Sequence, residues 1–118
     1  MRLYFDTAYV AKCYLNESDA KAVRKLADAA SGLYTSAWCI VELACVFQRH
    51  GRELGLSKAQ AAKSRGLFLE DARNSVWSLL PLSENFLFRV ESLVATLPPS
   101  LGSMAVIVVT FWAAMRTL

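Results

Sequence analysis

Residues 2–7 read RLYFDT and residues 33–42 read LYTSAWCIVE, and these two stretches decide the fold. Each begins as a short apolar run, which is typical of a buried strand, and each then reaches a residue suited to capping a helix. Each also carries one carboxylate, Asp6 in the first stretch and Glu42 in the second. A carboxylate in an apolar setting costs several kcal/mol unless a positive group, often a metal ion, meets it. These two acids are therefore the leading candidates for a functional site.

The composition indicates one folded domain. The chain has 118 residues, of which 55% are hydrophobic and 19% charged, so it can bury a normal core and disorder is not expected. The net charge of +3 permits RNA or DNA as a partner without requiring one. The odd set Cys13, Cys39 and Cys45, all in apolar surroundings, predicts reduced thiols that fill the core of a cytoplasmic protein. His50, the single histidine, is expected to act as a cation at a helix end.

Short apolar runs alternate with helical patterns along the chain. We expect strands at residues 2–5, 33–35 and 76–80. We expect helices at 8–15, from Ser18 to about 30, from Thr35 or Ser36 to about 50, from Ser57 to about 73, and from Ser83 to the Pro98-Pro99 pair. The helix that ends near residue 50 is apolar nearly all round and is expected to be buried on most sides. This alternation predicts an α/β domain with a parallel sheet.

The apolar run at residues 104–114, MAVIVVTFWAA, is too short to cross a membrane, since a span needs about 20 residues. A buried strand or helix is the expected structure there. Asp6 and Lys12 interrupt the N-terminal apolar stretch, so a secretory signal is not expected. We therefore predict no membrane association.

In a parallel α/β sheet, functional groups gather at the carboxyl ends of the strands, where Asp6 is expected. Asp6 also suits the N-cap of the next helix, and the two roles are compatible. The helical neighbours of Glu42 are not expected to pair with it; the alternative is a Glu at the helix margin that reaches solvent. Carboxylates without His or Cys select hard cations such as Mg²⁺ or Mn²⁺, which position water and stabilise charge on a phosphoryl group.

Two blocks of the sequence resemble the PIN domain family. Residues 3–14, LYFDTAYVAKCY, are similar to its opening, where a first strand ends in an Asp followed by Thr or Ser. Residues 34–42, YTSAWCIVE, are similar to its second block, a Thr-Ser pair with a Glu six residues beyond the Ser. Residues 97–101, LPPSL, resemble the approach to the third block. The spacing and helix order over about residues 1–101 resemble the VapC-like toxins of toxin–antitoxin pairs.

This resemblance implies a PIN-like three-layer α/β domain, with a short parallel sheet flanked by helices. It also implies an endoribonuclease toxin that uses Mg²⁺ or Mn²⁺, cleaves RNA, is inhibited by a cognate antitoxin protein and forms a homodimer. Asp6 and Glu42 would be the catalytic, metal-binding carboxylates, with Thr7 and Ser36 as supporting hydroxyls. Five basic residues are candidates for holding RNA phosphates, although a solvated helix face explains them equally well: Lys12, Arg49, Arg52, Lys63 and Arg65.

The sequence departs from the family pattern after residue 101. The third block of the family carries an Asp, and a further Asp lies near a later strand, whereas residues 102–118 contain no acid. We therefore divide the chain into a PIN-like part, residues 1–101, and an atypical apolar segment, residues 102–118, and expect the C-terminal part to be incomplete. A shifted reading frame, a truncation or a recombined end would explain the change, and the coding DNA tests this hypothesis. Cleavage weaker than that of an intact relative is expected.

Two other interpretations remain open. In the first interpretation the chain is a non-catalytic PIN-like module, which binds an antitoxin or a second copy of itself through exposed apolar side chains. The candidates for that surface are Val10, Tyr14, Leu67, Phe68 and residues 104–112. In the second interpretation the chain is a small membrane-associated protein, and only its apolar tail supports this.

Overall fold

The protein is built on a parallel sheet of three short strands. The computed structural model describes residues 1–53, 55–100 and 102. Within them, β1 (Arg2–Tyr4), β2 (Gly32–Ser36) and β3 (Trp77–Leu80) pair in the order β1-β2-β3, and both pairs are parallel. The predicted α/β domain with a parallel sheet is thus confirmed, and the strands lie where the sequence places them. The prediction of a buried strand or helix at residues 104–114 falls outside the described part of the chain.

Five helices connect and flank these strands in the described chain. They are α1 (Thr7–Tyr14), α2 (Ala20–Ala29), α3 (Cys39–Glu53), α4 (Lys58–Arg73) and α5 (Glu84–Val94). Three helices have their N-caps at the residues that the sequence predicts. The Asp6 carboxylate accepts a hydrogen bond from the Tyr9 amide, Ser57 forms a complete capping box, and the Ser83 hydroxyl accepts from the Phe86 amide.

The start of α2 differs from the prediction. Asp19, rather than Ser18, is the N-cap, and its side chain makes no capping hydrogen bond. Its carboxylate instead forms an ion pair with Lys12 of α1 at 2.6 Å, which holds α2 against α1. The prediction of a Ser18 cap is wrong because this contact between helices takes the place of a local cap.

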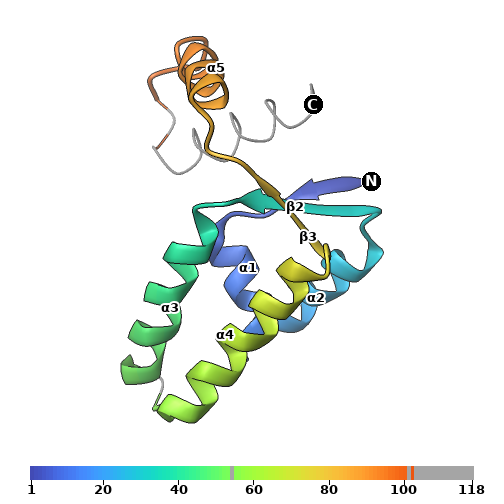
Figure 1. Ribbon diagram of the computed structural model, residues 1–118, viewed down its shortest axis with the longest axis vertical. Coiled ribbons are helices and arrows are strands. Elements are labelled where there is room, and N and C mark those ends of the chain that lie inside the picture. Colours follow the sequence, from blue (N-terminus) through green and yellow to red (C-terminus); the bar gives the residue numbers. More distant parts are fainter. Residues whose placement is uncertain (54, 101, 103–118) are drawn as a thin grey trace.

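Helices cover both faces of the sheet, with α1 to α4 on one side and α5 on the other (Figure 1). Strand alternation explains the division, because successive side chains point to opposite faces. Leu3, Leu33 and Leu79 pack in the larger core with α1 to α4, whereas their neighbours Tyr4, Tyr34 and Leu80 pack with Phe86 of α5. The described helices therefore lie on both sides of the sheet.

Helix α3 is buried on only one side. Its core stripe is Cys39, Leu43 and Phe47, at most 2% exposed, spaced four residues apart. Outside this stripe Ile40 and Val41 are exposed, and Trp38 just before the helix is 53% exposed. The prediction that α3 is buried on most sides is wrong, because its main helical neighbours in the described chain, α1 and α4, both pack on the core side.

Two of the apolar residues proposed for docking belong to the core. Val10 is fully buried and Phe68 is 1% exposed, so neither is available to a partner. Tyr14 is partly buried, Leu67 is 47% exposed, and residues 104–112 lie outside the described part of the chain. Helical periodicity alone did not reveal which side of α1 and α4 faces the sheet. No helix in the described ranges is both long and apolar enough to cross a lipid bilayer.

The Tyr14 hydroxyl ties three elements together in the larger core. It donates to Asp71 Oδ2 at 2.6 Å and accepts from the Trp77 indole N–H at 2.6 Å, so it links α1, α4 and the start of β3. Its ring also packs edge-on against Phe68, with 5.7 Å between ring centroids. Burial, helped by the acceptor Asp71, raises the pKa of the Tyr14 phenol well above its ordinary value. The hydroxyl therefore keeps its proton at neutral pH and remains a donor.

Replacement of Tyr14 by Phe tests the importance of this hydroxyl. We expect Tyr14→Phe to lower the free energy of unfolding by about 1–3 kcal/mol, because it leaves Asp71 and the Trp77 N–H without their partner. Urea denaturation followed by circular dichroism measures this change. Tyr9→Phe is the matched control, since Tyr9 lies on the same helix with 47% of its surface exposed, and we expect a change below about 0.5 kcal/mol. Equal effects of the two substitutions would contradict the role given to Tyr14.

Candidate functional site

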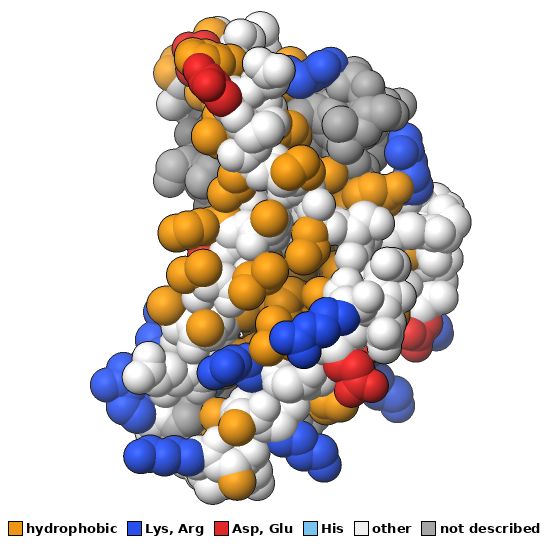
Figure 2. Space-filling view, viewed as in Figure 1, with side chains coloured by type: hydrophobic (Ala, Val, Ile, Leu, Met, Phe, Trp, Pro, Cys, Tyr) orange, Lys and Arg blue, Asp and Glu red, His pale blue; other side chains and the backbone are white. Residues whose placement is uncertain are grey.

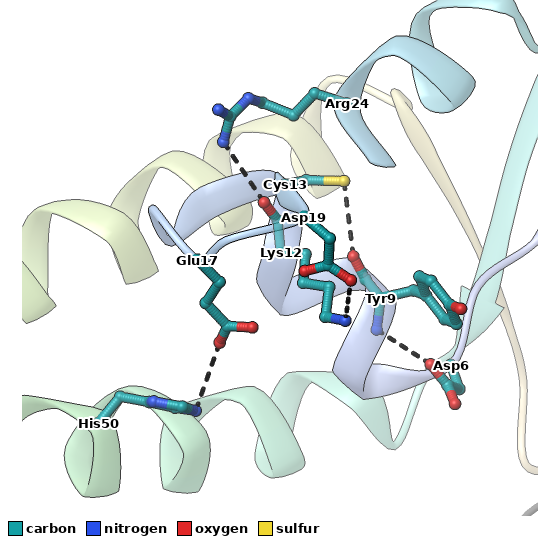
Figure 3. Close-up of polar contacts among 8 residues, drawn as sticks. All are labelled: Asp6, Tyr9, Lys12, Cys13, Glu17, Asp19, Arg24 and His50. Carbon is teal, nitrogen blue, oxygen red and sulfur yellow. Dashed lines mark hydrogen bonds and ion pairs between the residues drawn. The ribbon is translucent and has the colours of Figure 1, made fainter. Parts of the chain in front are cut away.

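The predicted site residues gather at the carboxyl ends of β1 and β2. Asp6 follows β1 after one residue and caps α1, with its Oδ1 atom 2.9 Å from the Tyr9 amide (Figure 3). Ser36 is the last residue of β2, and its hydroxyl accepts from the Trp38 amide at 3.1 Å. Ser36 therefore shapes the turn that leads into α3. Parallel pairing of β1 with β2 brings these two strand ends to the same edge of the sheet.

One hydrogen bond brings the two acidic regions into contact. The Thr7 hydroxyl donates to Glu42 Oε1 at 2.9 Å, across 35 residues of sequence. Thr7 directly follows Asp6, so the Glu42 carboxylate is held at the start of α1, where Asp6 forms the cap. The first turn of α3 thus faces the first turn of α1. Thr7, predicted as a supporting hydroxyl, has a defined contact with one of the two acids.

The carboxylates of Asp6 and Glu42 both affect the pKa values of two further side chains, Tyr4 and Cys39. Burial is the main reason why the pKa of the Tyr4 phenol is raised far above its ordinary value, and Asp6 and Glu42 add to the rise. Burial likewise raises the pKa of the Cys39 thiol, and the same two carboxylates add to that rise. The hydroxyls of Thr35 and Thr7 act in the opposite direction on Cys39. Both acids thus act on the same phenol and the same thiol, and the hydrogen bond from Thr7 to Glu42 is the contact that links the two acidic regions.

Glu42 is exposed to solvent, and Asp6 is partly exposed. The expectation that an apolar environment encloses Glu42 is wrong, and the alternative of a Glu at the margin of its helix is the one that the structure bears out. Trp38, Ile40 and Val41 surround it in sequence but turn outward, because α3 packs on one side only. The cost of burying a charge therefore gives no reason for a cation here. The reason lies in the hydrogen bond from Thr7, the residue after Asp6, which holds the Glu42 carboxylate at the start of α1.

The donor set suits a hard divalent cation. The hydrogen bonds of the site use Oδ1 of Asp6 and Oε1 of Glu42, and each carboxylate also has a second oxygen, which is the type of ligand that a hard cation takes. Mg²⁺ is commonly held by one or two carboxylates, with water and substrate phosphates completing an octahedral shell. In the described residues, no group of three or more His, Cys, Asp or Glu side chains is placed to hold a metal ion. Two carboxylates alone would leave most coordination positions to water.

A groove of about 640 Å³ runs from this cluster between α1 and α3. Thr7 and Glu42 line one part of it, and Glu17 and His50 line another. His50 Nε2 lies 3.7 Å from a Glu17 carboxylate oxygen, which joins α3 to the turn before α2 (Figure 3). His50 lies in the last turn of α3, which ends at Glu53, so its place near the helix end agrees with the prediction.

The predicted basic residues separate into different parts of the surface. Lys12 and Arg49 line the groove beside Glu42, although Lys12 is engaged by Asp19, which raises the pKa of the lysine. Arg52 and Arg65 line a second groove, between α3 and α4. Lys63 lines neither groove. Only Arg49 is thus a basic side chain beside the site without an ion pair in the described chain.

Sequence reasoning missed Tyr4 as a neighbour of the acids. Tyr4 seemed to be an ordinary strand residue, and Cys39 a core residue, which its complete burial confirms. The signal was available in principle, since Tyr4 is two residues before Asp6. No sequence pattern indicated the Glu17–His50 pair, because a turn and a distant helix supply its two members.

The three cysteines differ in environment, and alkylation measures the difference. Cys39 is buried, Cys45 is exposed, and the pKa of Cys13 is raised to about 11, mainly by burial. At pH 8 only about one Cys13 thiol in a thousand would be the reactive thiolate. We expect iodoacetamide to modify Cys45 first, Cys13 slowly and Cys39 only on unfolding, as mapped by mass spectrometry.

The control for this experiment is the chain in urea, where all three thiols should react at similar rates. Modification of Cys39 as fast as Cys45 in the folded chain would contradict the burial of Cys39 beside the acidic cluster. The exposure of Cys45 also corrects the expectation that every cysteine fills the core.

Comparison of the chain with protein-family models, curated proteins and solved structures finds no match. The likeness to PIN domains therefore rests on the sequence blocks that contain Asp6 and Glu42. The fold adds no support to that likeness, because a parallel α/β sheet is shared by many unrelated proteins.

Proposed function

We propose that this protein is a metal-dependent endoribonuclease of the PIN type, a VapC-like toxin, with Asp6 and Glu42 as its catalytic carboxylates. The observation that carries the proposal is the Thr7–Glu42 hydrogen bond, which joins the two sequence blocks at the carboxyl edge of a parallel sheet. The type of fold and the position of the cluster agree with the general location of α/β active sites. RNA is the proposed substrate, and a cognate antitoxin the proposed inhibitor.

Each residue has a distinct role in this proposal. Asp6 and Glu42 would hold Mg²⁺ or Mn²⁺ through their carboxylate oxygens. Thr7 positions Glu42, and Arg49 in the adjoining groove attracts the RNA phosphates. The bound ion would supply a positioned water and stabilise negative charge at the phosphodiester. Ser36 contributes indirectly, by fixing the turn from which α3 begins.

We expect low activity. Asp6 and Glu42 supply two carboxylates, the described residues form no group of three or more His, Cys, Asp or Glu that could hold a metal ion, and residues 92–118 contain no acid. Fewer protein ligands leave the ion more hydrated and less firmly positioned, which weakens the fixed electrostatic field on which catalysis depends. Weak cleavage, more readily detected with Mn²⁺, is the expected behaviour.

The nuclease proposal is tested with substitutions that remove charge and preserve shape. In an assay with fluorescently labelled RNA and Mn²⁺, we expect Asp6→Asn and Glu42→Gln each to reduce the cleavage rate at least tenfold. Asn is as good an N-cap as Asp, so Asp6→Asn should leave α1 intact. Glu53→Gln is the control for Glu42→Gln, since Glu53 is an exposed acid at the other end of α3. Equal cleavage by all four proteins would mean that the two acids take no part.

The role of Thr7 is tested by metal binding rather than by activity. Thr7→Val removes the hydroxyl that holds Glu42, whereas Thr7→Ser keeps it. We expect Thr7→Val to weaken Mn²⁺ binding about three- to tenfold, because the Glu42 side chain becomes free to rotate, and Thr7→Ser to bind almost as the parent protein does. Electron paramagnetic resonance of free Mn²⁺ gives both affinities. The same affinity for Thr7→Val and Thr7→Ser would contradict the positioning role.

A second candidate function is a non-catalytic interaction module that binds an antitoxin or forms a homodimer. The exposed apolar side chains of α3 favour it, with Ile40 39% and Val41 47% exposed. Stable co-purification with a partner and no RNA cleavage with Mn²⁺ would support this function over the first. Both functions are compatible with the same fold, and the acidic cluster favours the nuclease.

A further inference from the structure

A second groove lies between α3 and α4; it shares Val41 and Cys45 with the first groove, but neither Asp6 nor Glu42 lines it. It has a volume of about 670 Å³, and none of its lining residues is a candidate catalytic residue. The two helices meet at one end and diverge toward the sheet (Figure 1). Seen from the same side, hydrophobic side chains gather over the middle of the face, and Lys and Arg side chains surround its lower half (Figure 2).

The groove is apolar in its floor and cationic at its margin. Its apolar lining includes Val41, Ala44, Phe47, Leu56, Ala61 and Ala62. Three cations stand among the lining residues, Arg52, Lys58 and Arg65, and all three are exposed. No acidic side chain of the described chain lines the groove, and none of the three cations has an ion pair there.

We propose that the groove between α3 and α4 binds an acidic amphipathic helix of another protein. An apolar helix face would cover the floor, and flanking Glu or Asp side chains would pair with Arg52, Lys58 and Arg65. Ala44, Ala61 and Ala62 are small, so a third helix backbone can approach closely. Helices α3 and α4 have 15 and 16 residues, about 22–24 Å each at 1.5 Å per residue, which suits a partner of three to four turns.

Two other occupants of such a groove, a second copy of this chain and single-stranded RNA, fit it less well. A second copy of this chain has the same sign of net charge, +3, and would bring its own groove cations to the contact. Single-stranded RNA binds best where exposed aromatic rings stack on bases, but Phe47, the aromatic side chain of the groove, is 2% exposed. An acidic amphipathic helix would cover the apolar floor with its apolar face and pair its carboxylates with the three cations. This inference refines the interaction-module function and does not depend on the nuclease.

The test uses two designed peptides and charge-reversed proteins. The acidic peptide has about 16 residues, with Leu and Ala on one helical face and Glu on its flanks; the basic peptide replaces every Glu with Lys. Fluorescence anisotropy of the labelled peptides measures binding. We expect the acidic peptide to bind the parent protein at least tenfold more tightly than the basic peptide. We also expect the double variant Arg52→Glu/Arg65→Glu to lose at least tenfold in affinity for the acidic peptide.

The matched control is Lys25→Glu/Lys63→Glu, which reverses two exposed charges outside the groove and should change affinity less than twofold. Asp6→Asn should bind the acidic peptide as the parent does, so failure of the nuclease proposal would leave this result unaffected. Equal binding of both peptides, or equal losses in the two double variants, would overturn the proposal. A homodimer of the parent protein that dissociates in the Arg52→Glu/Arg65→Glu variant would also overturn it. So would binding of a short RNA to the parent protein that this double variant abolishes and the control variant does not.

Discussion

The fold depends on the hydroxyl of Tyr14, which sits between an acceptor on α4 and a donor on β3. Without it, Asp71 and the Trp77 indole would each lose a partner in a partly buried setting, and α1 would lose its polar link to the last strand of the sheet. The position of α1 then sets the position of Asp6 and Thr7, which lie at its first turn. A contact at one end of α1 thereby helps to fix the geometry of the candidate site at its other end.

Much of the fold followed from the sequence, because the local signals agreed with the tertiary structure. Ser57 and Ser83 mark helix starts by chemistry that needs no distant partner, and Asp6 does the same at the end of β1. The parallel order of the strands followed from their alternation with helices. The Ser18 cap failed because Asp19 pairs with Lys12, a contact between two helices that no local pattern encodes.

The side on which a helix faces the core was harder to predict. Helix α3 has an apolar stripe around much of its surface, and the sequence gives no sign that only the Cys39, Leu43 and Phe47 side is covered. For the same reason the exposure of Glu42, and the burial of Val10 and Phe68, were not foreseen. The candidate site was predictable as a pair of acids, Asp6 and Glu42. Their connection through Thr7 required coordinates.

The strands pair in the order in which they occur along the chain, and this affects how the protein would fold during synthesis. β1 and β2 can pair as soon as residue 36 has left the ribosome, but β3 begins at Trp77, about 40 residues later. At 5–20 residues per second, the interval is roughly 2–8 s. During that time Phe5 and Leu33 lack the indole ring that later covers them, which gives a chaperone an apolar surface to recognise on the nascent chain.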